Sequence, residues 1–369
     1  MSTQLGRVVS LVTEKATATT VQVGLEMIER NTGERRPSEA EYEGEGVAFA
    51  PGDVLFGKLR PYLAKSWLAD IHGAAVGDFH VLRPDLTSVE PRFVHYFTLS
   101  RAFLDEVTAA VQGAKMPRAN WDTVRNVRIH LPPISTQRAI ADYLDRETAQ
   151  IDTLVAKQEQ LVTTLRERKA AVTSQTIEMP WAPLRPLRRL ADCWDHLRIP
   201  LNAEERALVP GDVPYWGANS IQDYVCRALV NESIVLIGED GAPFFDPFRP
   251  VAFAIDGPIW PNNHIHVLKP RDDTSPSWLA YALNSVDYSL YVAGSTRDKL
   301  NQSALLSIVL RVPPLDEQHR IVAHLDEQIS KIDLLISKAE QFIALSRERR
   351  SALITAAVTG QLDVTERAA

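Results

Sequence analysis

Residues 129–145 read IHLPPISTQRAIADYLD, and residues 310–326 read LRVPPLDEQHRIVAHLD. The two stretches align without a gap at an offset of 181 residues. The same offset brings Arg166-Glu167-Arg168 onto Arg347-Glu348-Arg349 downstream, and Asn120 onto Asn301 upstream. Solenoid and propeller repeats have periods of about 20 to 50 residues, far shorter than this one. The sequence therefore predicts one large module that occurs twice in the chain.

A long helix is predicted at the end of each copy, at residues 135–177 and 316–358. Neither range contains Pro or Gly, whereas two prolines stand just upstream of each range. A Pro-Pro pair fixes the backbone and ends a preceding strand. Ser135 or Asp316 can then cap the first turn of the new helix. Gly360 is the predicted stop of the second helix.

Both predicted helices carry apolar residues at the seven-residue spacing of a coiled coil. The predicted seam residues are Leu144, Ile151, Leu154, Leu161 and Leu165 in the first helix, and Leu325, Ile332, Leu335, Phe342 and Leu353 in the second. One such stripe alone also fits an ordinary amphipathic helix packed on its own domain. Two stripes of matching register favour pairing, and the globular segment between the helices allows an antiparallel pair. A helix of this length spans about 65 Å at 1.5 Å per residue.

The remaining segments are rich in Gly, Pro and short apolar runs, such as residues 52–56 and 233–237, which predict strands between turns. Residues 93–107 and 277–288 look like short helices. The predicted fold class is α+β: two similar strand-rich globular target-recognition domains separated by two long helices that form an antiparallel coiled coil, with a pseudo-two-fold internal repeat. The predicted boundaries are residues 1–131 for the first domain, 132–179 for the first spacer helix, 180–312 for the second domain, and 313–369 for the second spacer helix and tail.

The composition excludes several classes of protein. The chain is 45% hydrophobic and 24% charged, which excludes a mostly disordered protein. Its net charge of -7 excludes a bulk polycation that coats nucleic acid, although a local basic face remains possible. With only two cysteines, no disulfide framework or Cys-rich zinc site is expected. No apolar run approaches the roughly 18 residues of a membrane span, and the first ten residues lack a secretion signal, so we expect a cytoplasmic protein.

The two junctions quoted above resemble those of the specificity subunit of type I restriction–modification systems. Four further stretches are similar to that family: LFGKLRPYL at 55–63, YWGAN at 215–219, LIGEDG at 236–241 and AVTGQL at 357–362. Each motif alone is moderately specific. Because all of them occur in this order, the resemblance covers nearly the whole chain.

The resemblance implies a non-catalytic subunit that recognises double-stranded DNA. Each globular domain would recognise one half of a bipartite, asymmetric target, and the helices would set the gap between the halves. The chain would dock two modification (methyltransferase) subunits and, through them, the restriction subunits. The assembled complex would be a site-specific deoxyribonuclease and an adenine-N6 DNA methyltransferase. S-adenosylmethionine, ATP and magnesium are expected on those partners and no cofactor on this chain.

Candidate DNA contacts must be local, because neither domain is basic on average. Arg and Lys bind guanine or phosphate, and Asn pairs with adenine. The candidates are Lys58, Arg60, Tyr62, Lys65, Lys115, Arg118, Asn120, Asn219, Asn262, Asn263, Arg297, Lys299 and Asn301. The pattern at 58–65 predicts cations on one face of a strand beside an aromatic, or alternatively a solvated strand edge. Asn120 and Asn301 have a competing interpretation as helix caps.

No coherent set of catalytic or metal-binding residues is predicted. The run from Gly52 to Lys58 starts like a phosphate loop, but Leu59 stands where a Ser or Thr would bind magnesium. Residues 246–248 (DPF) are expected to form a structural turn. His264 and His266 have no cysteine close in the sequence, so no metal cluster is expected. Three alternatives remain open: a specificity module of another multi-subunit restriction system, a coiled-coil adaptor without a DNA role, and a stand-alone enzyme.

Overall fold

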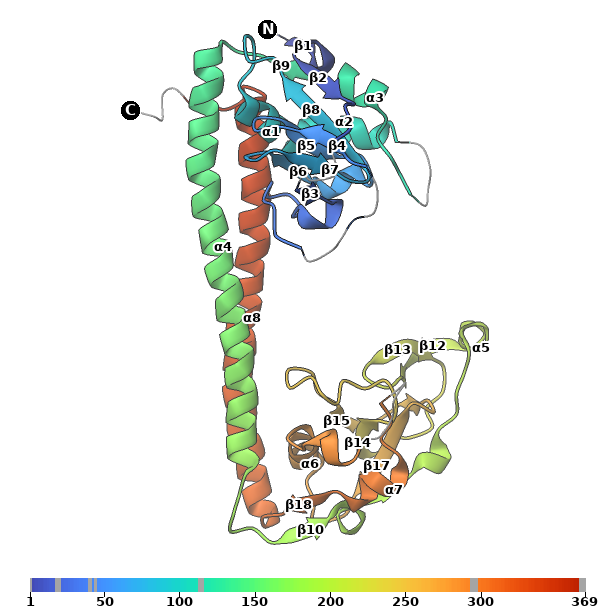
Figure 1. Cartoon of the computed structure of the whole chain (residues 1–369). Helices are drawn as coiled ribbons and strands as arrows, with labels where there is room; N and C mark the ends of the chain where they lie inside the picture. Colours follow the sequence, from blue (N-terminus) through green and yellow to red (C-terminus); the bar gives the residue numbers. More distant parts are fainter. Residues whose placement is uncertain are drawn as a thin grey trace. The chain divides into compact units, whose positions relative to one another are not determined.

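The computed structural model describes residues 2–16, 21–38, 42, 45–111, 116–292 and 298–364. The chain forms two compact units (Figure 1). Unit 1 consists of Met1–Glu159 and Gln341–Ala369, and unit 2 consists of Gln160–Glu340. Each unit therefore combines a globular part with portions of two long helices, α4 (Ile134–Ile177) and α8 (Leu315–Val358).

The globular part of unit 1 contains two small sheets and a short strand pair. Its strand pairing orders are β2-β8-β5-β6, β3-β7-β4 and β1-β9. The strands are β1 (Ser2–Gln4), β2 (Val9–Val12), β3 (Gln22–Val23), β4 (Val47–Phe49), β5 (Val54–Gly57), β6 (Ser66–Leu68), β7 (Gly73–Ala75), β8 (Phe79–Pro84) and β9 (Arg128–His130). The helices are η1 (Leu5–Arg7), η2 (Leu25–Met27), η3 (Pro61–Leu63), α1 (Pro91–Leu99), α2 (Arg101–Ala109) and α3 (Trp121–Asn126).

Unit 2 has the corresponding sheets, with pairing orders β11-β17-β14-β15, β13-β12-β16 and β10-β18. The strands are β10 (Leu184–Pro186), β11 (Ala191–Cys193), β12 (Pro210–Trp216), β13 (Ile221–Val225), β14 (Ser233–Gly238), β15 (Ala252–Asp256), β16 (Trp260–Pro261), β17 (Ile265–Pro270) and β18 (Val309–Arg311). The helices are η4 (Leu187–Arg189), η5 (Asp195–Leu197), α5 (Ala203–Ala207), α6 (Pro276–Asn284), η6 (Tyr288–Leu290) and α7 (Gln302–Ser307).

The predicted duplication and α+β class are confirmed by the matching order of these elements. The four-stranded sheets have the same antiparallel pairing, with β5 between β8 and β6, and β14 between β17 and β15. The helix predicted at 93–107 is in fact two helices, because Ser100 is extended and its side chain accepts a hydrogen bond from Phe103 N. In unit 2 the predicted helix at 277–288 ends at Asn284, and η6 follows.

A buried glutamine joins each long helix to the globular part of its unit. Gln137 and Gln318 are fully buried and occupy equivalent places in the first turns of α4 and α8. The Gln137 carbonyl accepts Glu90 N at 2.9 Å, and the Gln318 carbonyl accepts Ser275 N at 2.7 Å. Both bonds satisfy free N–H groups at the start of α1 or α6. The repeated glutamine therefore has a structural role: its buried amide must be hydrogen-bonded, and its partners tie the long helix to α1 or α6.

The helices begin one residue earlier than predicted. Ser135 and Asp316 thus lie within the first turn, and not at the cap, because Gln137 N and Gln318 N already bond to the carbonyls of Pro133 and Pro314. The predicted stop is confirmed: Gly360 has a left-handed φ of 77°, just beyond the end of α8. No helix among the residues described is long and apolar enough to cross a membrane.

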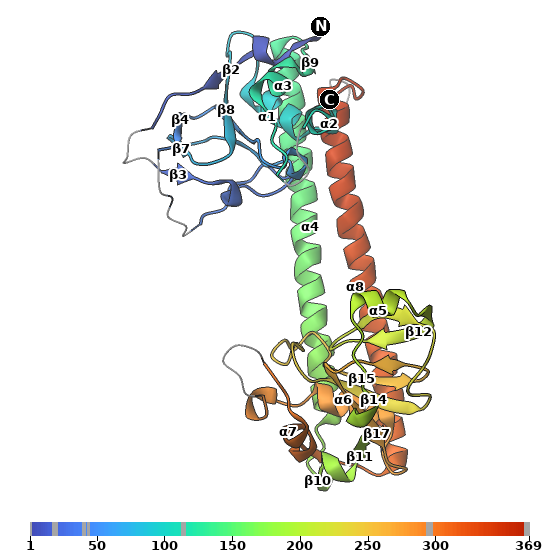
Figure 2. The same cartoon turned by 90° about the vertical axis from the view of Figure 1, so that its right-hand side faces the viewer.

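In each unit α4 and α8 lie side by side (Figure 1 and Figure 2). In unit 1 Arg347 and Arg350 of α8 pair with Glu159 and Asp152 of α4, in that order. In unit 2 Arg166 and Lys169 of α4 pair with Glu340 and Asp333 of α8, in that order. Since residue numbers rise along one helix as they fall along the other, the pairing is antiparallel. The predicted antiparallel pair of helices is confirmed within each unit.

Part of the predicted seam is wrong. Leu144, Ile151, Leu165, Leu325 and Ile332 are buried, and Leu353 is partly buried. Leu154, Leu161, Leu335 and Phe342 are 47%, 43%, 51% and 41% exposed. The buried series on α4 runs through Ile151, Val155, Val162 and Leu165 instead. The second buried position of each heptad on α4 therefore comes four residues after Ile151, at Val155, and not three residues after it, at Leu154. The four exposed residues lie beside the seam.

Candidate nucleic-acid interface

In unit 1 the candidate cations Lys58 and Arg60 lie in the loop that joins β5 to β6. We call residues 58–65 the β5–β6 loop. Lys58 N donates to Asp78 O at 2.8 Å, and Ala119 N donates to Lys58 O at 2.9 Å. Arg60 N donates to Pro117 O at 2.8 Å, and Arg60 itself has a left-handed φ of 51°. These bonds fix the loop to the residues before β8 and before α3.

The side chains of this loop do not form the predicted strand face. The prediction is wrong because β5 ends at Gly57 and the chain turns through η3. Lys65 points its ammonium at the Leu25 carbonyl, 2.6 Å away, and burial lowers the pKa of Lys65. Arg60 is exposed and Tyr62 is 52% exposed. Of the described side chains in this loop, these two are the most accessible to a ligand.

Asp78 holds the neighbouring cations in place. Its carboxylate lies 3.8 Å from Lys58 Nζ and 3.0 Å from an Arg118 Nη atom. The Arg118 side chain is 55% exposed, so it can also reach a ligand. Asn120 accepts Thr123 N at 2.7 Å and caps α3, as the competing interpretation predicts. Its carbonyl oxygen is thereby occupied, while DNA contact by its amide NH2 stays a prediction.

Unit 2 has the same backbone arrangement at the start of its β14–β15 loop, residues 239–251. Glu239 N donates to His264 O at 2.9 Å, and Leu300 N donates to Glu239 O at 2.8 Å. Gly241 N donates to Asp298 O at 3.3 Å, and Gly241 has a left-handed φ of 66°. Glu239, Gly241 and Leu300 thus make the bonds that Lys58, Arg60 and Ala119 make in unit 1.

The charges on this shared backbone differ between the units. Where unit 1 has Lys58, unit 2 has Glu239, which pairs with Lys299 at 3.0 Å and with Arg198. Burial alone would raise the pKa of Glu239, but the hydrogen bonds from Arg198 and Lys299 lower it below its ordinary value. His264 Nδ1 lies 2.6 Å from an Asp240 carboxylate oxygen. The two units therefore present different hydrogen-bonding groups at equivalent positions.

The candidate asparagines of unit 2 have varied surroundings. Asn301 accepts Ala304 N at 2.9 Å and caps α7, which is the competing interpretation again. Asn262 is buried and accepts His264 N at 2.8 Å, so it shapes the loop. Asn219 donates to Gly241 O at 3.0 Å, and Asn263 is exposed. Asn219 Oδ1 is buried with no hydrogen-bond partner in the described part of the chain.

Two of the candidate residues cannot be placed, and two residues that were not candidates contribute to the site. Lys115 and Arg297 lie outside the described residues. Asp78 and Arg198 were not among the sequence candidates, yet they position the cations and the acid of the two loops. No sequence signal marks Asp78, since the 181-residue offset places Ile259 and not an acid at the equivalent position. No sequence signal marks Arg198, because its partner Glu239 is distant in the chain.

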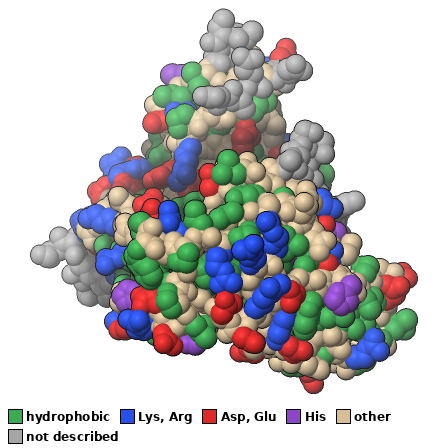
Figure 3. Space-filling model, turned by 90° about the horizontal axis from the view of Figure 1, so that it is seen from below, with side chains coloured by type: hydrophobic (Ala, Val, Ile, Leu, Met, Phe, Trp, Pro, Cys, Tyr) green, Lys and Arg blue, Asp and Glu red, His purple; other side chains and the backbone are tan. Residues whose placement is uncertain are grey.

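Figure 3 shows one face of the molecule on which Lys and Arg side chains gather among apolar ones, with Asp and Glu beside them. The outer strands and turns of unit 2 carry such mixed pairs, Arg185 with Asp273 and Arg271 with Asp192. Mixed charges agree with the near balance of acids and bases in the sequence. A DNA-binding face must therefore arise from individual placed cations and not from a uniformly basic surface.

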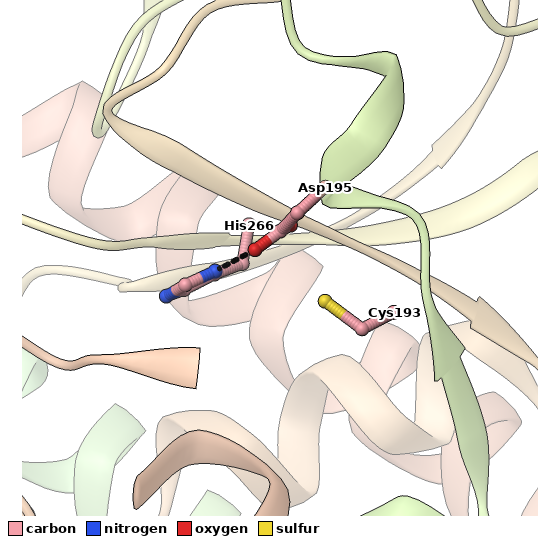
Figure 4. Close-up of side chains that lie close together, drawn as sticks. All are labelled: Cys193, Asp195 and His266. Atoms are coloured by element: carbon pink, nitrogen blue, oxygen red, sulfur yellow. Dashed lines mark hydrogen bonds and ion pairs between the residues drawn. The ribbon is translucent and has the colours of Figure 1, made fainter. Parts of the chain in front are cut away.

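Cys193, Asp195 and His266 lie together in unit 2 (Figure 4). The sequence did not predict this cluster, because only the pairing of β11 with β17 brings Cys193 near His266. His266 Nδ1 lies 2.6 Å from Asp195, and His266 Nε2 lies 2.8 Å from Leu300 O.

Hydrogen bonds occupy both ring nitrogens of His266 in this cluster. Burial alone would lower the pKa of His266, but the hydrogen bonds with Asp195, Cys193 and Leu300 O raise it to about 9. A protonated ring donates from both nitrogens, and the Asp195 carboxylate and the Leu300 carbonyl are placed to accept. Arg198 also lies 3.2 Å from the same Asp195 oxygen. The cluster is an ion pair that fastens β17 and Leu300.

The two short motifs that resemble catalytic loops have structural roles. Residues 52–58 form a turn and strand β5, as predicted, with Gly52 at a left-handed φ of 92°. In unit 2 Asp246 accepts Phe248 N at 3.0 Å, so residues 246–248 form a turn, also as predicted.

The family model and the similar proteins of known name point to the same family. A family model described as the type I restriction modification DNA specificity domain matches residues 65–163 and 198–341. A Haemophilus influenzae protein named as a type I restriction enzyme specificity subunit is 34% identical over 149 residues, 40% of this chain and 37% of that relative. The EcoDI specificity subunit of Escherichia coli is 24% identical over 29% of this chain and 23% of its own length. The chain thus matches well under two thirds of the length of these relatives.

Solved structures have the same fold over almost the whole chain. A chain from work on complex assembly and conformational transition of the type I R-M system has a TM-score of 0.80 at 19% identity, with 98% of both chains covered. The HsdS subunit of Thermoanaerobacter tengcongensis has a TM-score of 0.56 at 19% identity, with 98% of this chain and 97% of that chain covered. At this identity the likeness concerns the fold. Since the family model matches well over half of the residues, the chain belongs to the type I restriction modification DNA specificity domain family.

Proposed function

We propose that this chain is the DNA-recognition subunit of a type I restriction–modification complex and catalyses no reaction itself. The observation that carries the proposal is the shared backbone at Lys58 and Glu239, which bears different side chains in the two units. Base edges are distinguished by the pattern of donors and acceptors presented to them. Two similar domains with different donors and acceptors suit the two halves of an asymmetric target.

The two halves of the target would be separated by a gap of fixed length. Each long helix has 44 residues, about 66 Å at 1.5 Å per residue. We propose that this length sets the number of unread base pairs, since one turn of B-DNA measures about 34 Å. When two DNA-binding domains are linked in one chain, binding of the first raises the effective concentration of the second, so the chain binds DNA more tightly than either domain would alone.

The long helices also offer surfaces for partner subunits. Leu154 and Phe342 are exposed beside the seam in unit 1, and Leu335 and Leu161 are their equivalents in unit 2. Exposed apolar residues on a helix pair support docking of further helices. We propose that each unit docks one methyltransferase subunit, giving two per chain, and that the restriction subunits attach through these. S-adenosylmethionine, ATP and magnesium would then bind to the partners.

The test is reconstitution with the cognate modification subunit. The complex should contain two modification subunits per chain by native mass spectrometry, and it should methylate adenine at a bipartite motif found by sequencing of modified DNA. Methyl transfer by the chain alone would overturn the proposal. Complex formation without DNA binding in gel shifts at 100 mM salt and below would identify an adaptor. Assembly only with a different catalytic partner would identify another restriction system.

A further inference from the structure

Arg350 is buried inside unit 1, at the contact between the helix pair and the globular part. Its side chain is only 7% exposed, although arginine is almost never buried without partners. Arg350 Nε donates to both oxygens of Asp152 on α4, at 2.9 and 3.1 Å. Its two terminal nitrogens donate to Asn31 O at 2.7 Å and to Thr32 O at 2.9 Å. One guanidinium thus binds both long helices and one turn of the globular part.

The turn that Arg350 binds is held in an unusual conformation. Asn31 has a left-handed φ of 63° and Gly33 one of 82°, which orients consecutive carbonyls toward the guanidinium. A side chain at Gly33 would collide with His95, since an added Cβ would lie 2.4 Å from its Nε2. The turn is therefore packed against α1 on one side and bound by Arg350 on the other.

The same turn is hydrogen-bonded to the β5–β6 loop. Asn31 N donates to Ala64 O at 3.2 Å, and Ala64, with its left-handed φ of 47°, ends η3. Lys65 next to it donates to Leu25 O at 2.6 Å, which joins the loop to the residues before the turn. A short chain of bonds therefore runs from α8 through Asn31 and Ala64 to the exposed candidates Arg60 and Tyr62.

Unit 2 has no such connection among its described residues. Lys169 is the equivalent of Arg350 at the 181-residue offset, and it binds Asp333 as Arg350 binds Asp152. The Lys169 side chain is 38% exposed, and no backbone carbonyl of the globular part accepts its ammonium in the described structure. A lysine also lacks the planar fork that lets one arginine bind a carboxylate and two carbonyls.

We propose that Arg350 is a positioning residue that couples the helix pair to the β5–β6 loop and so maintains the fidelity of the target half recognised by unit 1. The inference rests on the proposed function, because it assigns a role in reading DNA. Arg350 touches no DNA in this proposal. It acts through the turn at Asn31, and fixed supporting contacts determine how well first contacts discriminate.

The first experiment needs neither DNA nor partners. Hydrogen exchange of the full-length chain is compared for wild type, Arg350→Lys and the matched unit 2 variant Lys169→Ala. Arg350→Lys keeps the charge beside Asp152 and loses the bonds to Asn31 and Thr32. Exchange in residues 29–36 and 59–65 should rise at least tenfold in Arg350→Lys, with β5 and β8 unchanged. Lys169→Ala should leave these peptides unchanged. Equal exchange in wild type and Arg350→Lys would overturn the coupling, even if the chain proves not to bind DNA.

The second experiment uses the reconstituted complex and the sequences it methylates. Arg350→Lys should relax base preference at least tenfold in one half of the motif, and Lys169→Ala in neither half. Equal relaxation of both halves, or loss of rate with unchanged preference, would show a general structural role and refute the proposal. If Arg350→Lys unfolds, Asn31→Gly keeps Arg350 and permits the left-handed φ of position 31 but loosens the turn, and the same two outcomes apply. Absence of any bipartite motif in wild type would refute the proposed function, while the exchange result would still decide the coupling.

Discussion

The carboxylate of Glu159 lies 2.6 Å from the guanidinium of Arg347, and the two residues join α4 to α8 in unit 1. The equivalent pair in unit 2 is Arg166 with Glu340, at 2.9 Å. Acid and base have exchanged helices between the units, as an antiparallel pair built from two copies of one sequence requires. All four side chains are about half exposed, so solvent screens both pairs.

Neutralising these acids should have a small effect on stability. Glu159→Gln and Glu340→Gln are each expected to lower the free energy of unfolding by less than about 1 kcal/mol, because exposed ion pairs contribute little. Urea denaturation at low and high salt measures this, and the difference from wild type should shrink at high salt. A loss of several kcal/mol for either variant would mean that these pairs are desolvated, contrary to their exposure.

Unit 2 should lose stability as the pH rises above neutrality. The raised pKa of His266, about 9, means that folded unit 2 holds a proton which the unfolded chain releases near pH 6.5. The stabilising contribution is therefore complete below pH 6.5 and disappears as the pH rises through about 9. Pulse proteolysis in urea, with unit 2 fragments identified by mass spectrometry, should show this fall in wild type. His266→Gln should flatten it, and an equal fall in that variant would exclude His266 as the cause.

Unit 1 should respond to pH in the opposite direction. Burial, together with the charge of Arg350, lowers the pKa of His95 to about 4. The unfolded chain takes up a proton near pH 6.5 that folded unit 1 cannot accept until about pH 4, so stability falls as the pH drops between these values. Because carboxylates also titrate there, the relevant quantity is the difference between wild type and His95→Gln. On acidification the free energy of unfolding of wild type should fall relative to that of His95→Gln, and a constant difference would contradict the assignment.

Charge on the exposed leucine and phenylalanine of the helix pair should block docking of the modification subunit. Leu154→Glu with Phe342→Glu in unit 1 should leave one such subunit bound per chain, because the Leu161 and Leu335 site of unit 2 persists. The unfolding temperature should change little, since both side chains are exposed. Leu86→Glu is the control, since Leu86 is exposed in unit 1 but lies outside the helices. Two subunits bound to the double variant by native mass spectrometry would refute docking at this site.

Arg60 should contribute an electrostatic contact to DNA. Arg60→Ala is expected to reduce the slope of log affinity against log salt by about one, as loss of a single phosphate contact does. Arg36→Ala is the matched control in unit 1, because Arg36 is exposed and paired with Glu29. Fluorescence anisotropy of the assembled complex over a salt series measures both. Equal slopes for wild type and Arg60→Ala would remove Arg60 from the interface.

The sequence predicts the elements that repeat and fails where contacts are non-local. The Pro-Pro pair marks the start of each long helix to within one or two residues, and Gly360 marks the end of the second. These signals act within a few residues, so they are visible in one sequence. The sequence places the second seam position at Leu154, one residue before the buried Val155. Both residues are apolar, so only packing determines which of them is buried.

In the candidate site, too, the sequence reveals what depends on the repeat and misses what depends on contacts between distant residues. The equivalence of Asn120 with Asn301 follows from the repeat, but their capping role, which the sequence offers only as a competing interpretation, is established by the structure. Nothing in the sequence distinguishes buried Arg350 from exposed Arg349 beside it, since the burial depends on a turn more than 300 residues upstream. The cluster at His266 was missed for the same reason: strand pairing, not sequence proximity, brings Cys193 to it.

The equivalent main-chain hydrogen bonds at Lys58 and Glu239 hold the backbone in the same way in both units, whatever the side chains are. The equivalent bonds at these two positions run between backbone atoms, so the residues at 58, 118, 239 and 299 can be exchanged without loss of any of those bonds. Under the proposed function, a new DNA preference would then need only a change of side chain on an unchanged backbone. Under the proposed function, a change in one unit would leave the preference of the other unit intact, so the two halves of the target could change independently.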